Sequence, residues 1–156
     1  MSDENKRNYN LDDPEEFKIY LLDNMVNGVD IFGDTVYEFI KQDPKLVFFY
    51  LFHSNLFLYD ILGQTNYYNE HPTIFYKDDV DAKQKYEEFT DILSNDAPHS
   101  VLFACITLRR FKKGEPAIRK DPKAKEQYDK LIDTLKKDKI VMAVDEVRKE
   151  LEEYEP

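Results

Sequence analysis

The 156-residue sequence is poor in the residues on which small secreted folds and glycine-rich folds depend. It contains one cysteine, Cys105, so no disulfide forms within the chain and a disulfide-built scaffold is excluded. Only four glycines are present, which leaves little for glycine-rich phosphate-binding loops or a turn-dense β fold, and tryptophan is absent. A chain of this length nevertheless buries a hydrophobic core in a single domain without such staples.

Long hydrophobic runs are also missing. The longest uncharged run covers residues 46–59, fourteen residues, whereas a membrane-spanning helix needs about 20. Residues 1–8 contain no apolar core of the kind found in a signal peptide, and they are not the Arg-rich, acid-poor helix of a transit peptide. We therefore expect a chain that stays in the cytosol, has lost a presequence, or is imported through an internal signal.

The charges that are present are unbalanced along the chain. The chain has 22 basic and 32 acidic residues and a net charge of −10, which disfavours coating of DNA or membranes by the chain as a whole. Residues 109–125 reverse this trend, with eight basic and two acidic residues. These eight, called the basic band below, are Arg109, Arg110, Lys112, Lys113, Arg119, Lys120, Lys123 and Lys125. They form either a solvated helix end, which is the plainer interpretation, or a surface for an acidic protein partner, RNA phosphate or acidic lipid.

Hydrophobic spacing predicts an all-α fold of short antiparallel helix pairs, packed as helix hairpins or in a solenoid-like manner. Asp-Pro occurs at residues 13–14, 43–44 and 121–122, and Asp favours the N-cap while Pro favours the first helical position. Residues 1–12 are predicted to be a polar arm. The predicted helices cover residues 14–27, 34–41, 44–62, 79–93, 98–111, 122–137 and 139–153, with a connection over 64–78.

Residues suited to catalysis or metal binding are few and poorly spaced. His53, His71 and His99 are far apart in the sequence. Asp78, Asp79 and Asp81 resemble the start of a calcium loop, but the glycine and the closing glutamate of such a loop are missing from their places. Cys105 falls on a predicted apolar helix stripe, so we expect a buried core residue. We therefore expect no catalytic residue, no metal site, no cofactor and no enzymatic activity.

The sequence is rich in aromatic residues, with 11 Phe and 11 Tyr. Those of the helix predicted over 44–62 cannot all face one side, so some are expected to meet a second surface. We predict a protein interface that includes Phe48, Phe52 and Phe57. Arg109, Arg110 and Arg119 are predicted to make charged contacts, either with acidic residues of a partner or with acidic helices of this chain.

One stretch resembles a known family. Residues 75–82, Phe-Tyr-Lys-Asp-Asp-Val-Asp-Ala, are similar to the Phe-x-Lys-Pro-Asp-Ile-Asp-Ala segment of cytochrome c oxidase subunit Va, which is subunit VI in fungi. Further matches follow in the family's order and at nearly its spacing. They are Ala97-Pro98 at the family's Pro-rich break, then Ala104, Arg109 and Arg110, then Ala117-Ile118-Arg119. The resemblance covers about residues 70–137 and divides the chain into an N-terminal helical extension, 13–68, and a helical domain, 69–156.

The resemblance implies a non-catalytic, all-α accessory subunit without a cofactor. Such a subunit lies on the matrix side of the mitochondrial inner membrane and is held there by other protein subunits of the respiratory complex. We expect no direct contact with nucleic acid. The alternative is a stand-alone, soluble, acidic binding or inhibitor protein of the immunity type, in the cytoplasm; a nucleic-acid-associated factor is a more distant third.

Overall fold

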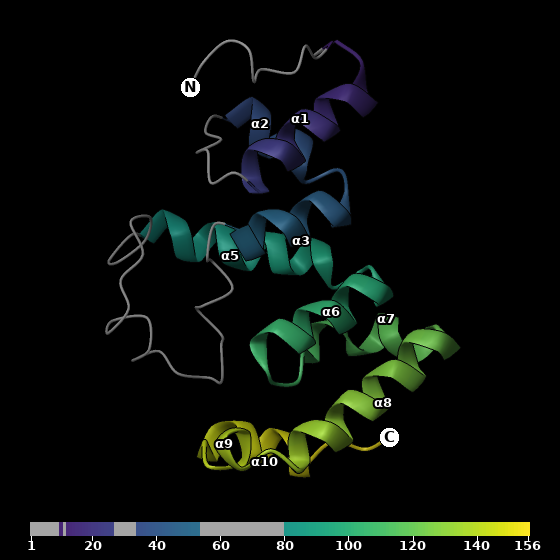
Figure 1. Ribbon diagram of the computed structural model, residues 1–156. Helices are drawn as coiled ribbons and strands as arrows, with labels where there is room; N and C mark the ends of the chain where they lie inside the picture. The colour runs from purple at the N-terminus through teal and green to yellow at the C-terminus, as the bar shows by residue number, and fades with distance from the viewer. Residues whose placement is uncertain (1–9, 11, 27–33, 54–79) are drawn as a thin grey trace.

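The computed structural model describes residues 10, 12–26, 34–53 and 80–156 (Figure 1). Within these residues the chain forms helices and no strand, which confirms the all-α prediction. The helices are α1 (Pro14–Val26), α2 (Asp34–Ile40), α3 (Pro44–His53), α5 (Val80–Leu93), α6 (Ala97–Thr107), the 3₁₀ turn η4 (Lys112–Gly114), α7 (Glu115–Lys120), α8 (Pro122–Lys136), α9 (Lys139–Met142) and α10 (Asp145–Glu152).

The helices pack on neighbours that are mostly close in sequence. α3 contacts α1 and α2 on one side and α5 and α6 on the other, so it joins the two predicted regions of the chain. α6 packs against α7 and α8, and α8 then packs against α9 and α10. In Figure 1 this order places α1 and α2 at one end of the molecule and α9 and α10 at the other.

The three Asp-Pro pairs begin helices, as predicted. α1, α3 and α8 start at Pro14, Pro44 and Pro122. In each case the preceding aspartate accepts a hydrogen bond from a backbone N–H of the first helical turn, at 2.9–3.1 Å for the residue two positions on. These contacts satisfy donors that a helix start otherwise leaves unpaired.

A continuous hydrophobic core runs through the stack. Each described helix of eight residues or more contributes at least one side chain that is almost completely buried. The largest almost completely buried side chains of the described residues are Leu21, Ile40, Leu46, Leu51, Phe89, Leu93, Phe103, Ile118, Tyr128, Ile132 and Leu151. Packing of this core fixes the positions of the short connections between helices, including the connection between α6 and η4, where charged side chains cluster.

Three predicted helix boundaries were wrong. α6 ends at Thr107 rather than at residue 111, because Leu108 adopts the left-handed conformation with φ 55°. A further helix, α7, forms between the helices predicted over 98–111 and 122–137, with Pro116 in its first turn, where proline is favoured. The helix predicted over 139–153 is two helices, because the backbone of Val144 is extended between α9 and α10.

Several predictions fall outside the described residues. These are the polar arm over 1–12 apart from residues 10 and 12, the end of the helix predicted over 44–62, the connection over 64–78, and the side chains of His53, Phe57 and His71.

Candidate functional site

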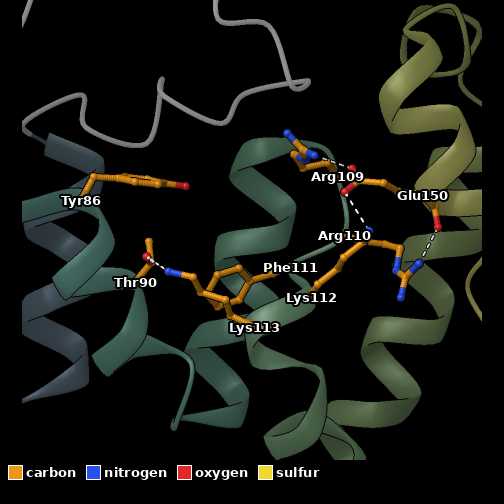
Figure 2. Close-up of a pocket in the computed structure, with 8 residues that line it drawn as sticks. All are labelled: Tyr86, Thr90, Arg109, Arg110, Phe111, Lys112, Lys113 and Glu150. Atoms are coloured by element: carbon orange, nitrogen blue, oxygen red, sulfur yellow. Dashed lines mark hydrogen bonds and ion pairs between the residues drawn. The ribbon is translucent and has the colours of Figure 1, made fainter. Parts of the chain in front are cut away.

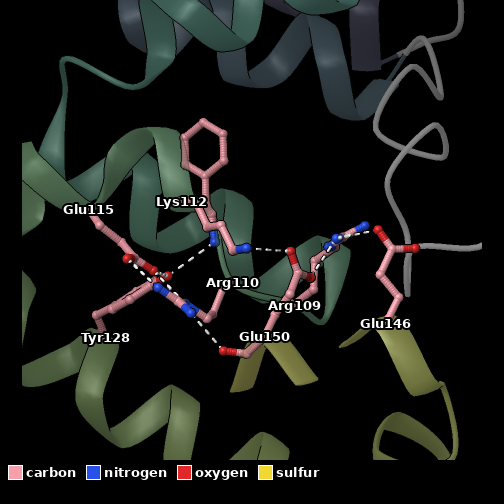
Figure 3. Close-up of polar contacts among 8 residues, drawn as sticks. Arg109, Arg110, Lys112, Glu115, Tyr128, Glu146 and Glu150 are labelled. Carbon is pink, nitrogen blue, oxygen red and sulfur yellow. Dashed lines mark hydrogen bonds and ion pairs between the residues drawn. The ribbon is translucent and has the colours of Figure 1, made fainter. Parts of the chain in front are cut away.

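A dense polar cluster lies where the link between α6 and η4 meets α7, α8 and α10 (Figure 3). Arg110 forms a two-pronged contact with Glu115, with Nε and Nη2 donating at 2.8 and 2.7 Å to the two carboxylate oxygens. The hydroxyl of Tyr128 donates to the same carboxylate at 2.6 Å and accepts from the backbone N–H of Phe111 at 3.0 Å. The side chains of Arg110 and Glu115 are only 11% and 10% exposed, so this pair is nearly buried.

Arg109 connects the same link to α10. Its Nη2 donates to Glu150 at 2.5 Å and to Glu146 at 3.3 Å. The left-handed residue Leu108 ends α6 one residue earlier and changes the direction of the chain. Arg110 Nη1 donates to the backbone carbonyl of Glu150 at 2.7 Å, so both arginines hold α10 against the link.

A second cluster surrounds the ring of Tyr154 near the C-terminus. Arg110 and Arg119 place their guanidinium carbons 5.1 and 5.4 Å from the ring centroid. The Tyr154 hydroxyl donates to Asp129 at 2.5 Å, and Arg119 donates to the backbone carbonyl of Glu155 at 2.7 Å. Cations over an aromatic face are attracted by its quadrupole, so the basic band also holds the C-terminal residues in place.

Burial and hydrogen bonding shift the pKa values of this cluster in opposite directions. Burial tends to raise the pKa of Glu115, but hydrogen bonds from Arg110 and Tyr128 outweigh it and hold that pKa below its ordinary value. Burial, and then the hydrogen bond to Glu115, raise the pKa of Tyr128 well above its ordinary value of 10.0. Glu115 is therefore held ionised and Tyr128 neutral, as expected of a fixed structural ion pair with a donating hydroxyl.

A cavity of about 140 Å³ lies beside this cluster, between α5, η4 and α10 (Figure 2). Four of the basic residues line it together with Glu150, Thr90, Tyr86 and Phe111. These cations already have carboxylate partners: Lys112 pairs with Glu150 at 3.4 Å and Lys113 with Asp91 at 2.8 Å. Because Arg109 and Arg110 are also paired, the cavity is nearly neutral and is poorly suited to an anionic ligand.

A different kind of surface lies on α3 and α6, and we call it the aromatic face: Phe48, Phe52, His99 and Leu102. The Phe48 and Phe52 rings stack 6.5 Å apart, and Phe48 lies 5.9 Å from the ring of His99. Leu102 follows His99 by one turn of α6 and is 46% exposed, while Phe52 is 40% exposed. His99 Nδ1 lies 2.6 Å from the carboxylate of Asp96, which also caps α6.

Cys105 is exposed, so its predicted burial in the core was wrong. α6 instead buries the faces of Val101, Phe103, Ala104 and Thr107, which turns Cys105 outward, one turn beyond Leu102. Desolvation of the thiol by the surrounding protein raises its pKa, so the neutral thiol is favoured over the reactive thiolate.

The described residues contain neither a metal-binding cluster nor a membrane-spanning helix. No group of three His, Cys, Asp or Glu side chains in this part of the chain could hold a metal ion. None of the helices described is long and apolar enough to cross a membrane.

The structure thus separates the predicted interface residues into two groups. Arg109 and Arg110 contact acidic helices of this chain, one of the two alternatives predicted for them, and Arg119 contacts a backbone carbonyl. Phe48 and Phe52 lie together on the aromatic face, whereas Phe57 lies outside the described residues. Whether any of them contacts a partner remains a prediction.

Sequence reasoning missed Glu115, Tyr128 and Glu150 as members of the polar cluster. The residues that meet there are 5 to 41 positions apart in sequence. A weak signal was available for Glu115, because an acidic residue followed by proline suits a first helical turn. The signal for Leu102 was the absence of Asp, Glu, Lys and Arg from the whole of α6.

In comparisons with known proteins, no family model matches the chain, and neither a curated protein nor a solved structure matches it. The resemblance of residues 70–137 to cytochrome c oxidase subunit Va therefore remains a prediction from the motifs.

Proposed function

We propose that this protein is a non-catalytic accessory subunit of a larger protein assembly, and that it binds its neighbour through the aromatic face. The observation that carries the proposal is the exposed surface of α6 and α3. α6 has no Asp, Glu, Lys or Arg over Ala97–Thr107, yet it exposes Leu102, one turn from His99, whose ring lies 5.9 Å from that of Phe48 on α3. A solvated helix face normally carries charged residues.

The composition of this face suits the core of a protein interface. Such cores are depleted of charged residues and enriched in aromatic ones. Phe48 stacks on Phe52 one turn along α3 and lies next to His99, and Leu102 follows His99 by one turn of α6, so the four residues are neighbours rather than scattered apolar residues. A contiguous apolar surface is more informative than a single exposed leucine.

The finer form of the proposal is a subunit Va-like component of mitochondrial cytochrome c oxidase. In that form the chain is peripheral to the inner membrane on the matrix side, is held by other subunits, and carries no cofactor. It is supported by the motif resemblance over residues 70–137. The all-α fold agrees with it but is shared by many unrelated proteins.

The test is purification of the tagged full chain from its own cells in mild detergent, followed by identification of co-purifying proteins. Leu102→Glu places a charge on the aromatic face and should reduce co-purification at least about tenfold, because an unpaired buried charge is costly. Leu102 is half exposed, so circular dichroism should show unchanged helix content. Gln127→Glu is the matched control, because it adds the same charge at an exposed position on α8, outside the aromatic face.

Each outcome is informative. Co-purification of haem-containing oxidase subunits, lost with Leu102→Glu, supports the finer proposal. A different multi-subunit assembly supports only the accessory role, and a single partner enzyme points to the inhibitor alternative. A wild-type chain that is recovered alone, or a Leu102→Glu chain that retains every partner, contradicts the proposal.

A further inference from the structure

A second exposed surface of opposite character lies at the turn between α8 and α9. α8 ends at Lys136 and α9 begins at Lys139, so Lys136, Lys137 and Lys139 are clustered within four positions, and all three are exposed. The next residue, Ile140, is 72% exposed, more than the other exposed large hydrophobic residues of the described chain. We call residues 136–144 the lysine tip; Figure 1 shows α9 at the opposite end of the molecule from α1 and α2.

The positive charge of the lysine tip is not neutralised by ion pairs. Within the described residues, no carboxylate lies within ion-pair distance of these three lysines, whereas Lys112, Lys113 and Lys125 of the basic band all have such partners. The aspartate inside the tip, Asp138, is occupied as a helix cap. Its carboxylate accepts from the backbone N–H groups of Ile140 and Val141 at 2.9 and 3.2 Å.

The lysines stand next to an uncharged apolar segment, residues 140–144, Ile-Val-Met-Ala-Val. Val141 is buried and anchors this segment to the core. Ile140 and Ala143, three positions apart, are exposed, and Met142 and Val144 are half-buried. The tip therefore presents aliphatic surface bordered by unpaired ammonium groups.

We propose that the lysine tip binds directly to the surface of an anionic lipid membrane. Lysine is depleted in protein interfaces, whereas clusters of lysine with aliphatic side chains suit the headgroup layer of acidic membranes. The lysine stems lie along apolar surface while their ammonium groups reach the phosphates, and Ile140 enters the boundary between headgroups and acyl chains. This proposal is independent of the aromatic face and of the accessory role.

The net charge of −10 does not prevent this contact. It orients the protein, because an anionic membrane repels the acidic surface and attracts the lysine tip. At about 0.1 M salt the Debye length is about 10 Å. The membrane then interacts with the nearest charges of the protein. When the tip faces the bilayer these are the three lysines, less the charge of Asp138 among them and of Asp145 directly after the tip, while acidic residues farther away are screened. Binding should weaken further as salt is added, because the lysine attraction is screened in turn.

The experiment is flotation of the purified full chain with vesicles. One set contains phosphatidylcholine alone and the other contains phosphatidylcholine with phosphatidylglycerol. The wild-type chain should float with the anionic vesicles only. Replacing Lys136, Lys137 and Lys139 together with glutamine should lower partitioning on the order of a hundredfold, about fivefold for each lysine. Ile140→Ser should lower it by about tenfold, because the apolar contact is lost.

The matched control replaces Lys120, Lys123 and Lys149 with glutamine. These residues are also exposed and outside any ion pair within the described residues, so the change in net charge is the same. This control should float like the wild type, and circular dichroism should confirm that all variants fold.

Three results would each overturn the proposal. The first is a chain that does not float with anionic vesicles, or that floats equally with neutral ones. The second is flotation that survives loss of the three tip lysines. The third is equal loss in the Lys120, Lys123 and Lys149 control, which would show that only the net charge matters; an acidic protein would then be the better candidate partner for the tip.

Discussion

Replacing Arg110 with methionine tests whether the buried polar cluster holds the C-terminal helices in place. The substitution keeps a long, flexible side chain but removes three hydrogen bonds, two to Glu115 and one to the backbone carbonyl of Glu150, at 2.7–2.8 Å. Glu115 is then left as a carboxylate that is only 10% exposed and is held by Tyr128 alone. An unpaired buried charge is the main cost of the change.

The expected magnitude follows from this burial. Removing one partner of a buried pair costs about 3–5 kcal/mol. We expect the lower end, about 3 kcal/mol, because Glu115 can take up a proton when Arg110 is absent. For a chain of this size 1 kcal/mol corresponds to about 2–4 °C, so the melting temperature should fall by about 6–12 °C.

The assay is thermal and urea unfolding at neutral pH, followed by circular dichroism. Lys130→Ala is the control, because its ion pair with Glu126 is exposed, at 75% and 68% for the two side chains, and should contribute less than about 0.5 kcal/mol. The double variant Arg110→Met, Glu115→Leu should recover most of the lost stability, because replacing both charges with apolar groups removes the unpaired carboxylate. If Arg110→Met loses no more stability than Lys130→Ala, the cluster does not stabilise the fold and our reasoning is refuted.

Three further predictions concern pH and packing. The pKa of Glu115 is lowered in the folded state, so the stability that this carboxylate contributes is present above the ordinary pKa of 4.5 and is lost as the pH falls through the folded pKa. In melting curves recorded at decreasing pH, the melting temperature of Glu115→Gln should therefore fall less than that of the wild type. The pKa of Tyr128 is raised in the folded state, so stability should fall as the pH rises above 10.0, because the phenol ionises first in the unfolded chain. The urea midpoint of Tyr128→Phe should therefore decrease less with rising alkaline pH than the midpoint of the wild type. Gly114→Ala would place a Cβ 2.6 Å from the side chain of Ser100 and should cost about 1–3 kcal/mol in urea unfolding; an unchanged midpoint would show that the link is looser than its packing indicates.

The helix starts could be predicted from the sequence because their causes are local. Asp121, for example, accepts hydrogen bonds from the backbone N–H groups two and three positions later, and Pro122 has the backbone angle that a first turn requires. No distant residue is needed to explain these starts. The same reasoning explains why the all-α class was predictable from apolar spacing along each helix.

The end of α6 and the division into α9 and α10 could not be predicted in this way. Leu108 adopts a conformation that leucine disfavours in isolation, and it packs partly against the core, so tertiary contacts compensate the local cost. The spacing of Ile140, Val144 and Val147 suits one continuous helix. In the structure the helix breaks at Val144, which leaves Ile140 exposed while Val141 and Val147 are buried.

The sequence by itself determined that the chain is helical, where several helices begin, and that positive charge gathers in residues 109–125. Only the tertiary structure decided what these charges contact, because Arg109 and Glu150 are 41 positions apart and are brought together by the packing of α10 beside the link. It likewise decided which apolar residues face solvent, turning Cys105 and Leu102 outward and Phe103 inward. A helix with no charged side chains has no sequence pattern that marks its buried face, so its orientation depends on the shapes of its neighbours.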